Sequence, residues 1–230
     1  MDLGENSLEA ARERLLGAAL AHVAFDGWSD RALAAAIAES GVAPGLAWAL
    51  FPRGGVDLAL AWHRHCDRLM AKALAAEEMS GLKFRERVFR AVRLRLELAG
   101  ERESLRRSSS LFGMPSHLAE GAGLIWGTAD AIWVALGDTS RDINWYSKRA
   151  TLSAVYAFTL LFWLGDESEG HAATSEFLHR RIENVMQFEK VKAGFRENPL
   201  GKALLAGPLK ILDRVHAPER AQDLPGRMTP

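Results

Sequence analysis

Apolar residues recur at the spacing of an α-helix along most of this chain of 230 residues, and this pattern limits the fold more than any other feature. No run of alternating β-branched and polar residues, which would indicate a strand, lies between turn residues. The sequence therefore predicts an all-α fold. In the first helical segment, for example, one face carries Leu8, Ala11, Leu15, Ala19 and Val23.

Capping residues predict where the helices begin and end. Asn6 with Glu9 resembles a capping pair and places the start of the first helix near Ser7, and that helix ends near residue 26. Ser29 precedes the second helix, and Gly41 suits its C-terminal cap. Further helices, the first opened by a proline, are predicted over residues 44–51, 56–78, 84–98, 101–112, 115–137, 141–164, 174–193 and 199–216.

A glycine break at residues 53–55 is the expected boundary between two parts of the chain. We expect a helix-turn-helix-like unit over residues 1–53 and a larger helical body over residues 54–196. An amphipathic helix is expected over residues 197–216. A disordered tail is expected over residues 217–230, because this segment is polar and rich in proline.

Composition excludes several classes of protein. The formal net charge is zero, which argues against a dedicated nucleic-acid binder. Cys66 is the single cysteine, so no intramolecular disulfide and no paired-cysteine zinc site can form. The longest mostly apolar run, residues 151–165, is shorter than the roughly 18–20 residues of a membrane-spanning helix. The acidic N-terminus resembles neither a signal peptide nor an organelle presequence, so a cytoplasmic location is expected.

The tight turn between the second and third helices has helix-turn-helix spacing. Residues 28–51 resemble the N-terminal domain of TetR-type repressors, in which the third helix enters the major groove of DNA. Base reading requires hydrogen-bonding side chains. Residues 42–51 carry no charge and no such side chain except the Trp48 indole. We therefore predict that the unit is retained for packing and does not bind DNA.

Patterns that could support catalysis or metal binding are weak. Residues 63–67 read H-R-H-C-D, but nothing nearby in sequence completes a ligand set. The glycines of residues 121–127 lack the strand and spacing of a nucleotide-binding turn, and they favour close helix packing or space for an apolar ligand. Residues 138–144 lack the glycine and distal glutamate of a calcium loop. In that segment we expect Thr139 or Ser140 to cap the following helix, with Asp142 in its first turn. No catalysis, metal or cofactor is therefore expected.

One long motif is more specific. Residues 138–149 read D-T-S-R-D-I-N-W-Y-S-K-R and match the pattern D-x-S-x-D-x-N-W-Y-[ST]-[KR]-R. This segment resembles the signature of the ubiquinone-biosynthesis lipid-binding accessory protein family. The resemblance is sharp over residues 125–168 and loose over residues 7–190.

The resemblance implies a TetR-like fold, a homodimer, and a pocket for an isoprenoid quinone precursor or a phospholipid. It also implies delivery of demethoxyubiquinone to a di-iron hydroxylase, with peripheral contact to the inner membrane. The absence of a presequence fits a bacterial member. By motif match, the surface that faces the hydroxylase would contain Asp142, Trp145 and Tyr146, joined by Asp130 and Ile132.

Apolar faces of the later helices could line the implied lipid pocket. The alternative is that these side chains fill an ordinary core, and the sequence alone leaves both open. The candidate lining residues are Leu124, Ile125, Trp133, Leu152, Val155, Tyr156, Thr159, Leu160, Phe177 and Ile182.

The last predicted helix is amphipathic, with a mildly basic polar face. This composition suits a helix lying in a membrane interface, and it suits equally a helix packed on the body or on a second subunit. The candidate membrane-binding residues are Leu204, Leu205, Leu209, Ile211 and Leu212. For the whole chain, the favoured function is lipid binding for ubiquinone biosynthesis. The alternative is a TetR-family transcriptional regulator that responds to a ligand.

Overall fold

The computed structural model describes residues 2–197 and 217–218, and the side chains of residues 7–187 and 217–218. This part of the chain contains no strand, so the predicted all-α fold is confirmed. The helices are α1 (Asp2–Asp26), α2 (Asp30–Ser40), α3 (Pro44–Leu50), α4 (Gly55–Ala76), α5 (Phe84–Glu97), α6 (Arg102–Phe112), α7 (Leu118–Ala135), α8 (Ile143–Gly165), the 3-10 turn η1 (Glu169–His171) and α9 (Ala172–Glu197).

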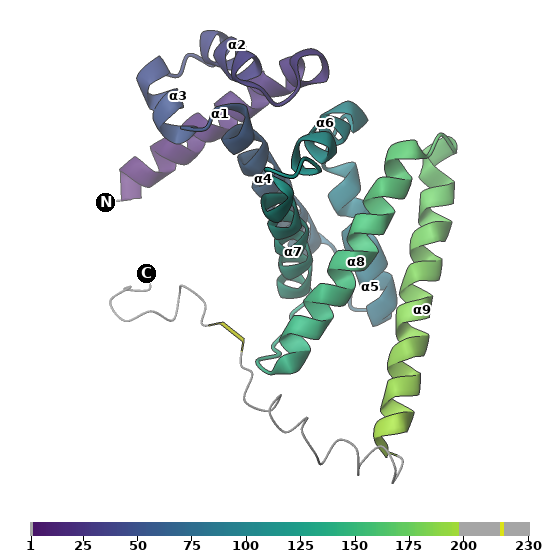
Figure 1. Cartoon of the computed structure of the whole chain (residues 1–230). Coiled ribbons are helices and arrows are strands. Elements are labelled where there is room, and N and C mark those ends of the chain that lie inside the picture. Colours follow the sequence, from purple (N-terminus) through teal and green to yellow (C-terminus); the bar gives the residue numbers. More distant parts are fainter. Residues whose placement is uncertain (1, 198–216, 219–230) are drawn as a thin grey trace.

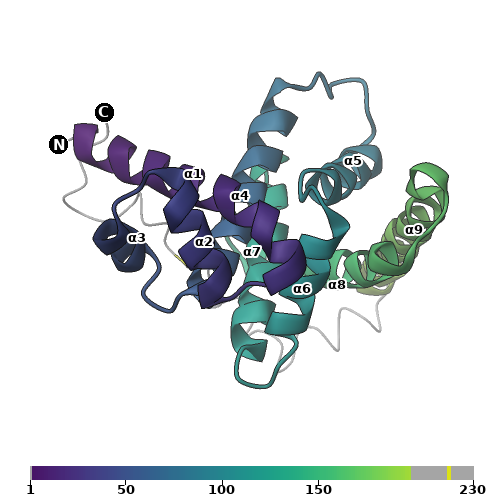
Figure 2. The same cartoon turned by 90° about the horizontal axis from the view of Figure 1, so that it is seen from above.

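The helices form a small unit of α1 to α3 beside a larger body of α4 to α9 (Figure 1). Within the body α4 packs on α7, α7 on α8, and α8 on α9. Seen from above, α9 lies at the edge of the body away from α3 (Figure 2). The start of α8 and the end of α9 lie at the end of the body that points away from α2 and α3, which we call the far pole (Figure 1).

The small unit and the body share one hydrophobic core. Trp28, at the turn between α1 and α2, packs its ring 5.0 Å from that of Trp62 on α4. The Trp28 indole also donates a hydrogen bond of 2.9 Å to the Ser104 carbonyl on α6. A Cβ at Gly55 would lie 2.4 Å from the Trp28 carbonyl, so only glycine allows α4 to start this close to the turn.

Most predicted helix ends agree with the structure. The Ser29 hydroxyl accepts a hydrogen bond from the Ala32 amide and caps α2, which ends at Gly41 in the left-handed conformation. The predicted start of α1 near Ser7 was wrong, because the helix begins at Asp2 and Asn6 lies inside it. The predicted start of α7 at residue 115 was also wrong, because turns extend from Met114 to His117 before the helix begins at Leu118.

The capping prediction for α8 was wrong as well. Asp142 is the N-cap, since its carboxylate accepts a hydrogen bond of 3.1 Å from the Asn144 amide. Ser140 instead donates to the Asp138 carboxylate in the preceding turn. Near the other end of the chain, the Ala217 amide donates to the Arg141 carbonyl at 2.9 Å. The predicted helix over residues 199–216 and its five membrane-binding candidates lie outside the described residues.

Candidate ligand-binding site

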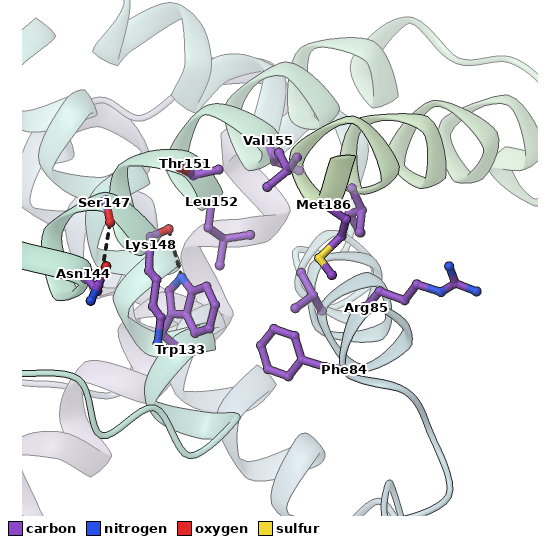
Figure 3. Close-up of a pocket in the computed structure, with 13 residues that line it drawn as sticks. Phe84, Arg85, Trp133, Asn144, Ser147, Lys148, Thr151, Leu152, Val155 and Met186 are labelled. Carbon is purple, nitrogen blue, oxygen red and sulfur yellow. Dashed lines mark hydrogen bonds between the residues drawn. The ribbon is translucent and has the colours of Figure 1, made fainter. Parts of the chain in front are cut away.

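A pocket of about 210 Å³ lies between α5, α7, α8 and α9, and we call it the α5–α9 pocket (Figure 3). Polar side chains, among them Arg85, Asn144 and Lys148, lie on part of its boundary. A pocket with apolar walls and a few polar groups is the usual form of a small-molecule site. Its apolar lining consists of Phe84, Val88, Trp133, Leu152, Val155, Ile182, Val185 and Met186.

Trp133 is held in place as one wall of this pocket. Its indole nitrogen donates a hydrogen bond of 3.1 Å to the Lys148 carbonyl (Figure 3). Phe84 stacks on its ring with the centroids 5.5 Å apart, and the Lys148 ammonium lies 5.2 Å from the ring centroid. Because three contacts from two other helices fix the ring, the wall is formed before any ligand binds.

The structure separates the predicted lining residues into groups. Trp133, Leu152, Val155 and Ile182 line the α5–α9 pocket. A second pocket of about 300 Å³, between α4, α6, α7 and α8, is lined in part by the other three aliphatic candidates. These three are Leu124, Ile125 and Leu160.

The other three candidates lie in neither pocket. Tyr156 and Thr159 are buried in the core and line neither pocket, which is the alternative that the sequence left open for them. Phe177 stacks on Phe162 with the ring centroids 4.6 Å apart, and this pair joins α9 to α8 outside both pockets. The predicted lining residues are therefore divided between two pockets, the packed core and an aromatic contact between α8 and α9.

The sequence analysis did not predict that α5 lines the pocket, and on α9 it missed Val185 and Met186. Phe84 and Val88 lie at positions i and i+4 of α5, and Ile182 and Met186 have the same spacing on α9. Both pairs are apolar stripes that the sequence shows. Without the tertiary arrangement, however, nothing indicates that the two stripes face each other.

The signature segment forms an ionic network at the turn between α7 and α8, in which Asp138 and Arg149 are buried. Asp138 accepts hydrogen bonds from Lys148 at 2.8 Å and from the Arg149 guanidinium at 3.0 Å. Burial alone would raise the pKa of Asp138, but the hydrogen bonds from Lys148, Ser140 and Arg149 outweigh it and lower this pKa to about 2. Asp138 is therefore a structural anion that holds the start of α8.

Arg149 connects this network to α7. Its side chain is completely buried and donates to Asp130 at 2.5 Å and to the Trp145 carbonyl at 3.1 Å. Its guanidinium also lies 4.1 Å from the centroid of the Trp145 ring. The motif residues thus fix the position of the aromatic side chains that follow them.

Three aromatic side chains gather beside this network, and we call them the aromatic cluster. Trp145 and Tyr146 meet edge to face with their centroids 4.7 Å apart, and Trp126 on α7 lies 5.9 Å from Trp145. All three are half-buried, and Asp142 beside them is exposed. Trp126 was missed because it lies outside the motif. Ile132 is fully buried, so its prediction as a surface residue is corrected.

The polar residues of α4 form a second buried network that does not support catalysis. His63 Nε2 lies 2.5 Å from the Ser108 hydroxyl, whereas Nδ1 lies 3.3 Å from Arg95. Since arginine only donates, Nδ1 accepts and Nε2 carries the proton. His63 therefore donates to Ser108 and cannot act as its general base.

The remaining groups of this network are structural too. The completely buried Arg95 donates to Asp67 at 2.6 Å. Burial raises the pKa of the Cys66 thiol to about 11, so the thiolate is not available as a nucleophile. Within residues 7–187 no three His, Cys, Asp or Glu side chains are grouped so that they could hold a metal ion.

The outer face of α3 is apolar in the structure. Ala47 packs into the core, while Leu46 and Trp48 are exposed, at 36% and 41%. In a DNA-binding helix-turn-helix these outer positions carry the polar side chains that contact bases and phosphates.

Comparison with known proteins identifies the family. The model of the COQ9 family matches residues 118–189, which contain α7, the ionic network, the aromatic cluster, α8 and much of α9. This segment of the chain therefore matches the COQ9 family. It is 30% identical to the mitochondrial ubiquinone biosynthesis protein COQ9 of Drosophila melanogaster, over 82% of this chain and 59% of that protein.

Other relatives are also ubiquinone biosynthesis proteins and match at similar identity. The chain is 31% identical to a probable mitochondrial ubiquinone biosynthesis protein of Dictyostelium discoideum, over 80% of this chain and 62% of that one. It is 28% identical to human COQ9, over 87% of this chain and 65% of that one. This chain thus spans about three fifths of the length of the curated relatives it matches.

A solved structure confirms the predicted TetR-like fold. A TetR transcriptional regulator from Nitrosomonas europaea superposes with a TM-score of 0.59 at 21% sequence identity, over 75% of this chain and 95% of that chain. At this identity the likeness concerns the fold alone. None of the helices in the described part of the chain combines the length and apolar character needed to cross a bilayer.

Proposed function

We propose that this protein is an accessory protein of ubiquinone biosynthesis that binds an isoprenoid quinone intermediate and presents it to the demethoxyubiquinone hydroxylase. The α5–α9 pocket is the proposed ligand site, and the aromatic cluster with Asp142 is the proposed hydroxylase surface. The pocket carries the proposal, because it provides apolar walls beside polar groups in a chain that matches the COQ9 family. Peripheral membrane contact and a homodimer remain part of the proposal.

The chemistry of the pocket supports an amphiphilic ligand of this type. A quinone ring offers carbonyl acceptors and no donor, and the pocket boundary supplies donors from Arg85, Asn144 and Lys148. An isoprenoid tail is apolar and suits the aliphatic and aromatic walls. At about 210 Å³ the pocket has room for part of such a molecule, so the rest of the tail would extend through the opening.

The position of the pocket on α8 supports presentation to a partner enzyme. Asn144, Ser147 and Lys148 contribute to the pocket boundary, while Trp145 and Tyr146 from the same two turns belong to the aromatic cluster. A ligand headgroup at this boundary would lie one helix width from the surface proposed to bind the hydroxylase. The enzyme could then reach the ring without full release of the tail.

The regulator alternative has less support. The fold likeness to a TetR regulator is shared by proteins of different function, and function resides in the site. The apolar outer face of α3 lacks the groups that would contact bases and phosphates.

The test is organic extraction of the purified protein followed by mass spectrometry. We expect an isoprenoid quinone or a quinone precursor to copurify with the wild type. Val155→Trp should reduce the extracted lipid at least several-fold, because the indole would occupy the pocket that Val155 lines. Ala154→Trp adds the same group at an exposed neighbouring position of α8 and should retain the lipid. Equal lipid content in all three proteins would contradict the proposal.

A further inference from the structure

A further cavity adjoins the α5–α9 pocket at the turn between α7 and α8, and we call it the turn pocket. It has a volume of about 330 Å³ and is lined by residues 136–140 together with Phe84, Trp133 and Lys148. The last three side chains also line the α5–α9 pocket, so the two pockets share a boundary. These three side chains lie together at one end of the α5–α9 pocket (Figure 3). One ligand could therefore extend from one pocket into the other.

The boundary of the turn pocket combines aromatic rings with hydrogen-bonding groups. Phe84 and Trp133 contribute their rings, which stack with the centroids 5.5 Å apart. Asp138, Ser140 and Lys148 contribute polar side chains. The α5–α9 pocket, by contrast, is lined mainly by apolar side chains. Because aromatic side chains favour contacts with other rings, the turn pocket suits a planar ring with polar substituents, and the α5–α9 pocket suits an apolar tail.

The charges around the turn pocket are balanced. Lys148 and Arg149 are cations, and they pair with the carboxylates of Asp138 and Asp130. The two exposed side chains that follow in the turn, at residues 141–142, are likewise one cation and one anion. A phosphate would therefore bring an uncompensated negative charge close to the Asp138 carboxylate. A neutral headgroup brings no such charge, so the balance favours a neutral ligand over a phospholipid headgroup.

Lys148 supplies a hydrogen-bond donor to this pocket. Its ammonium carries three N–H groups, and it donates to the Asp138 carboxylate at 2.8 Å and to the Ser140 hydroxyl at 2.6 Å. Among the described residues no third oxygen accepts from this ammonium. The side chain is 38% exposed, so a ligand in the turn pocket can reach the remaining N–H. The carbonyl oxygens of a quinone accept hydrogen bonds and match this donor.

We infer that the turn pocket is the headgroup subsite. The quinone ring lies there against Phe84 and Trp133 and accepts a hydrogen bond from Lys148, while the isoprenoid tail occupies the α5–α9 pocket. The inference rests on the proposed function for the class of ligand, and it adds the feature that separates quinones from other lipids with apolar tails. A phospholipid or an isoprenoid alcohol would use the α5–α9 pocket alone.

Two probes with the same tail test the subsite in the full chain. They are a ubiquinone with a geranylgeranyl tail and geranylgeraniol, the alcohol of that tail. Equilibrium binding of the radiolabelled compounds to the wild type should be at least several-fold tighter for the quinone. Thr139→Trp should remove this preference and leave the affinity for the alcohol unchanged, because Thr139 lines the turn pocket but not the α5–α9 pocket. The matched control Arg141→Trp adds the same group at an exposed position of this turn outside both pockets and should keep the preference.

Two further variants test the donor. Lys148→Met should lower the affinity for the quinone several-fold without changing that for the alcohol, whereas Lys148→Arg keeps a donor and should retain most of the quinone affinity. If Lys148→Met fails to fold, the result for Thr139→Trp decides, since Lys148 also belongs to the ionic network.

An unchanged quinone affinity in Thr139→Trp overturns the inference, and so does an equal loss for both probes. An unchanged quinone affinity in a folded Lys148→Met variant overturns the role of the donor. Binding of neither probe to the wild type, or full retention of both probes in Val155→Trp, would instead count against the proposed function. The two failures are therefore distinguishable.

Discussion

His63 is a buried titratable residue of the body. It is 6% exposed and lies between the Ser108 hydroxyl and the Arg95 guanidinium. Burial, and then the charge of Arg95, lower the pKa of His63 well below its ordinary value of 6.5. The imidazole therefore stays neutral in the folded state at pH values at which it is charged in the unfolded chain.

This difference predicts a loss of stability in mild acid. Below about pH 6.5 the unfolded state binds a proton at His63 that the folded state does not bind, so the free energy of unfolding falls as the pH falls. Urea unfolding at about pH 7.5 and about pH 5 would measure the fall. His63→Gln keeps a donor near Ser108 and should make the fall smaller. An equal fall in this variant would show that other groups cause it.

The sequence identified the signature segment but not the structural role of each of its residues. The pattern indicated that residues 138–149 matter, and it assigned a surface role to Asp142 and Trp145. The structure shows that Asp138, Lys148 and Arg149 form an ionic network, because these charges meet only when α7 and α8 fold back on each other. The sequence also could not show that Ile132 is buried. Its burial depends on which face of α7 packs against the body.

At the scale of elements, the start of α8 depends on the ionic network. Arg149 donates to Asp130, Asp138 and the Trp145 carbonyl from a completely buried position. Removing one partner of a buried ion pair leaves an uncompensated group in a region of low polarity. The network should therefore fix the position of the aromatic cluster relative to the α7–α8 turn.

We expect Arg149→Met to lower the free energy of unfolding by about 3 kcal/mol, the usual cost of breaking a buried ion pair. Arg141→Met removes the same group from an exposed position at the same turn and should change stability by less than about 0.5 kcal/mol. Urea titration followed by far-ultraviolet circular dichroism would compare the two variants. Similar losses in both would mean that the network contributes little.

The aromatic cluster gives a test of the hydroxylase surface. Trp145→Lys would place a cation beside the Arg149 guanidinium, which now lies against the Trp145 ring, and would disturb the fold. Tyr146→Lys is the more informative change, and it should weaken hydroxylase binding by about 2 kcal/mol with the fold retained. Titration calorimetry with the purified hydroxylase would measure it.

The control for that experiment is Phe158→Lys, which changes an aromatic residue that is 59% exposed in the second half of α8. We expect hydroxylase binding of this variant to equal that of the wild type. If Tyr146→Lys binds as tightly as the control, the partner contacts another surface.

At the scale of the whole molecule, the sequence predicted the helices better than the cavities. Helical periodicity specifies where α2, α3 and α8 lie, and cap residues give the ends of α2, since these signals are local in the chain. The broad apolar face of α8 does not specify what each side chain meets. Val155 lines one pocket, Leu160 lines the other, and Tyr156 is buried in the core, because α8 packs against α6, α7 and α9 on different faces.

The whole molecule also decides whether the helix-turn-helix can function on DNA. Phosphate contacts require clustered cations, and base reading requires polar side chains on the third helix. The chain has 29 basic and 29 acidic residues, and the outer face of α3 presents Leu46 and Trp48. Selection from random duplexes at physiological salt should therefore return no enriched sequence. A reproducible palindromic site, lost in Trp48→Ala but kept in Phe25→Ala, would instead support a ligand-responsive regulator, with the α5–α9 pocket as its effector site.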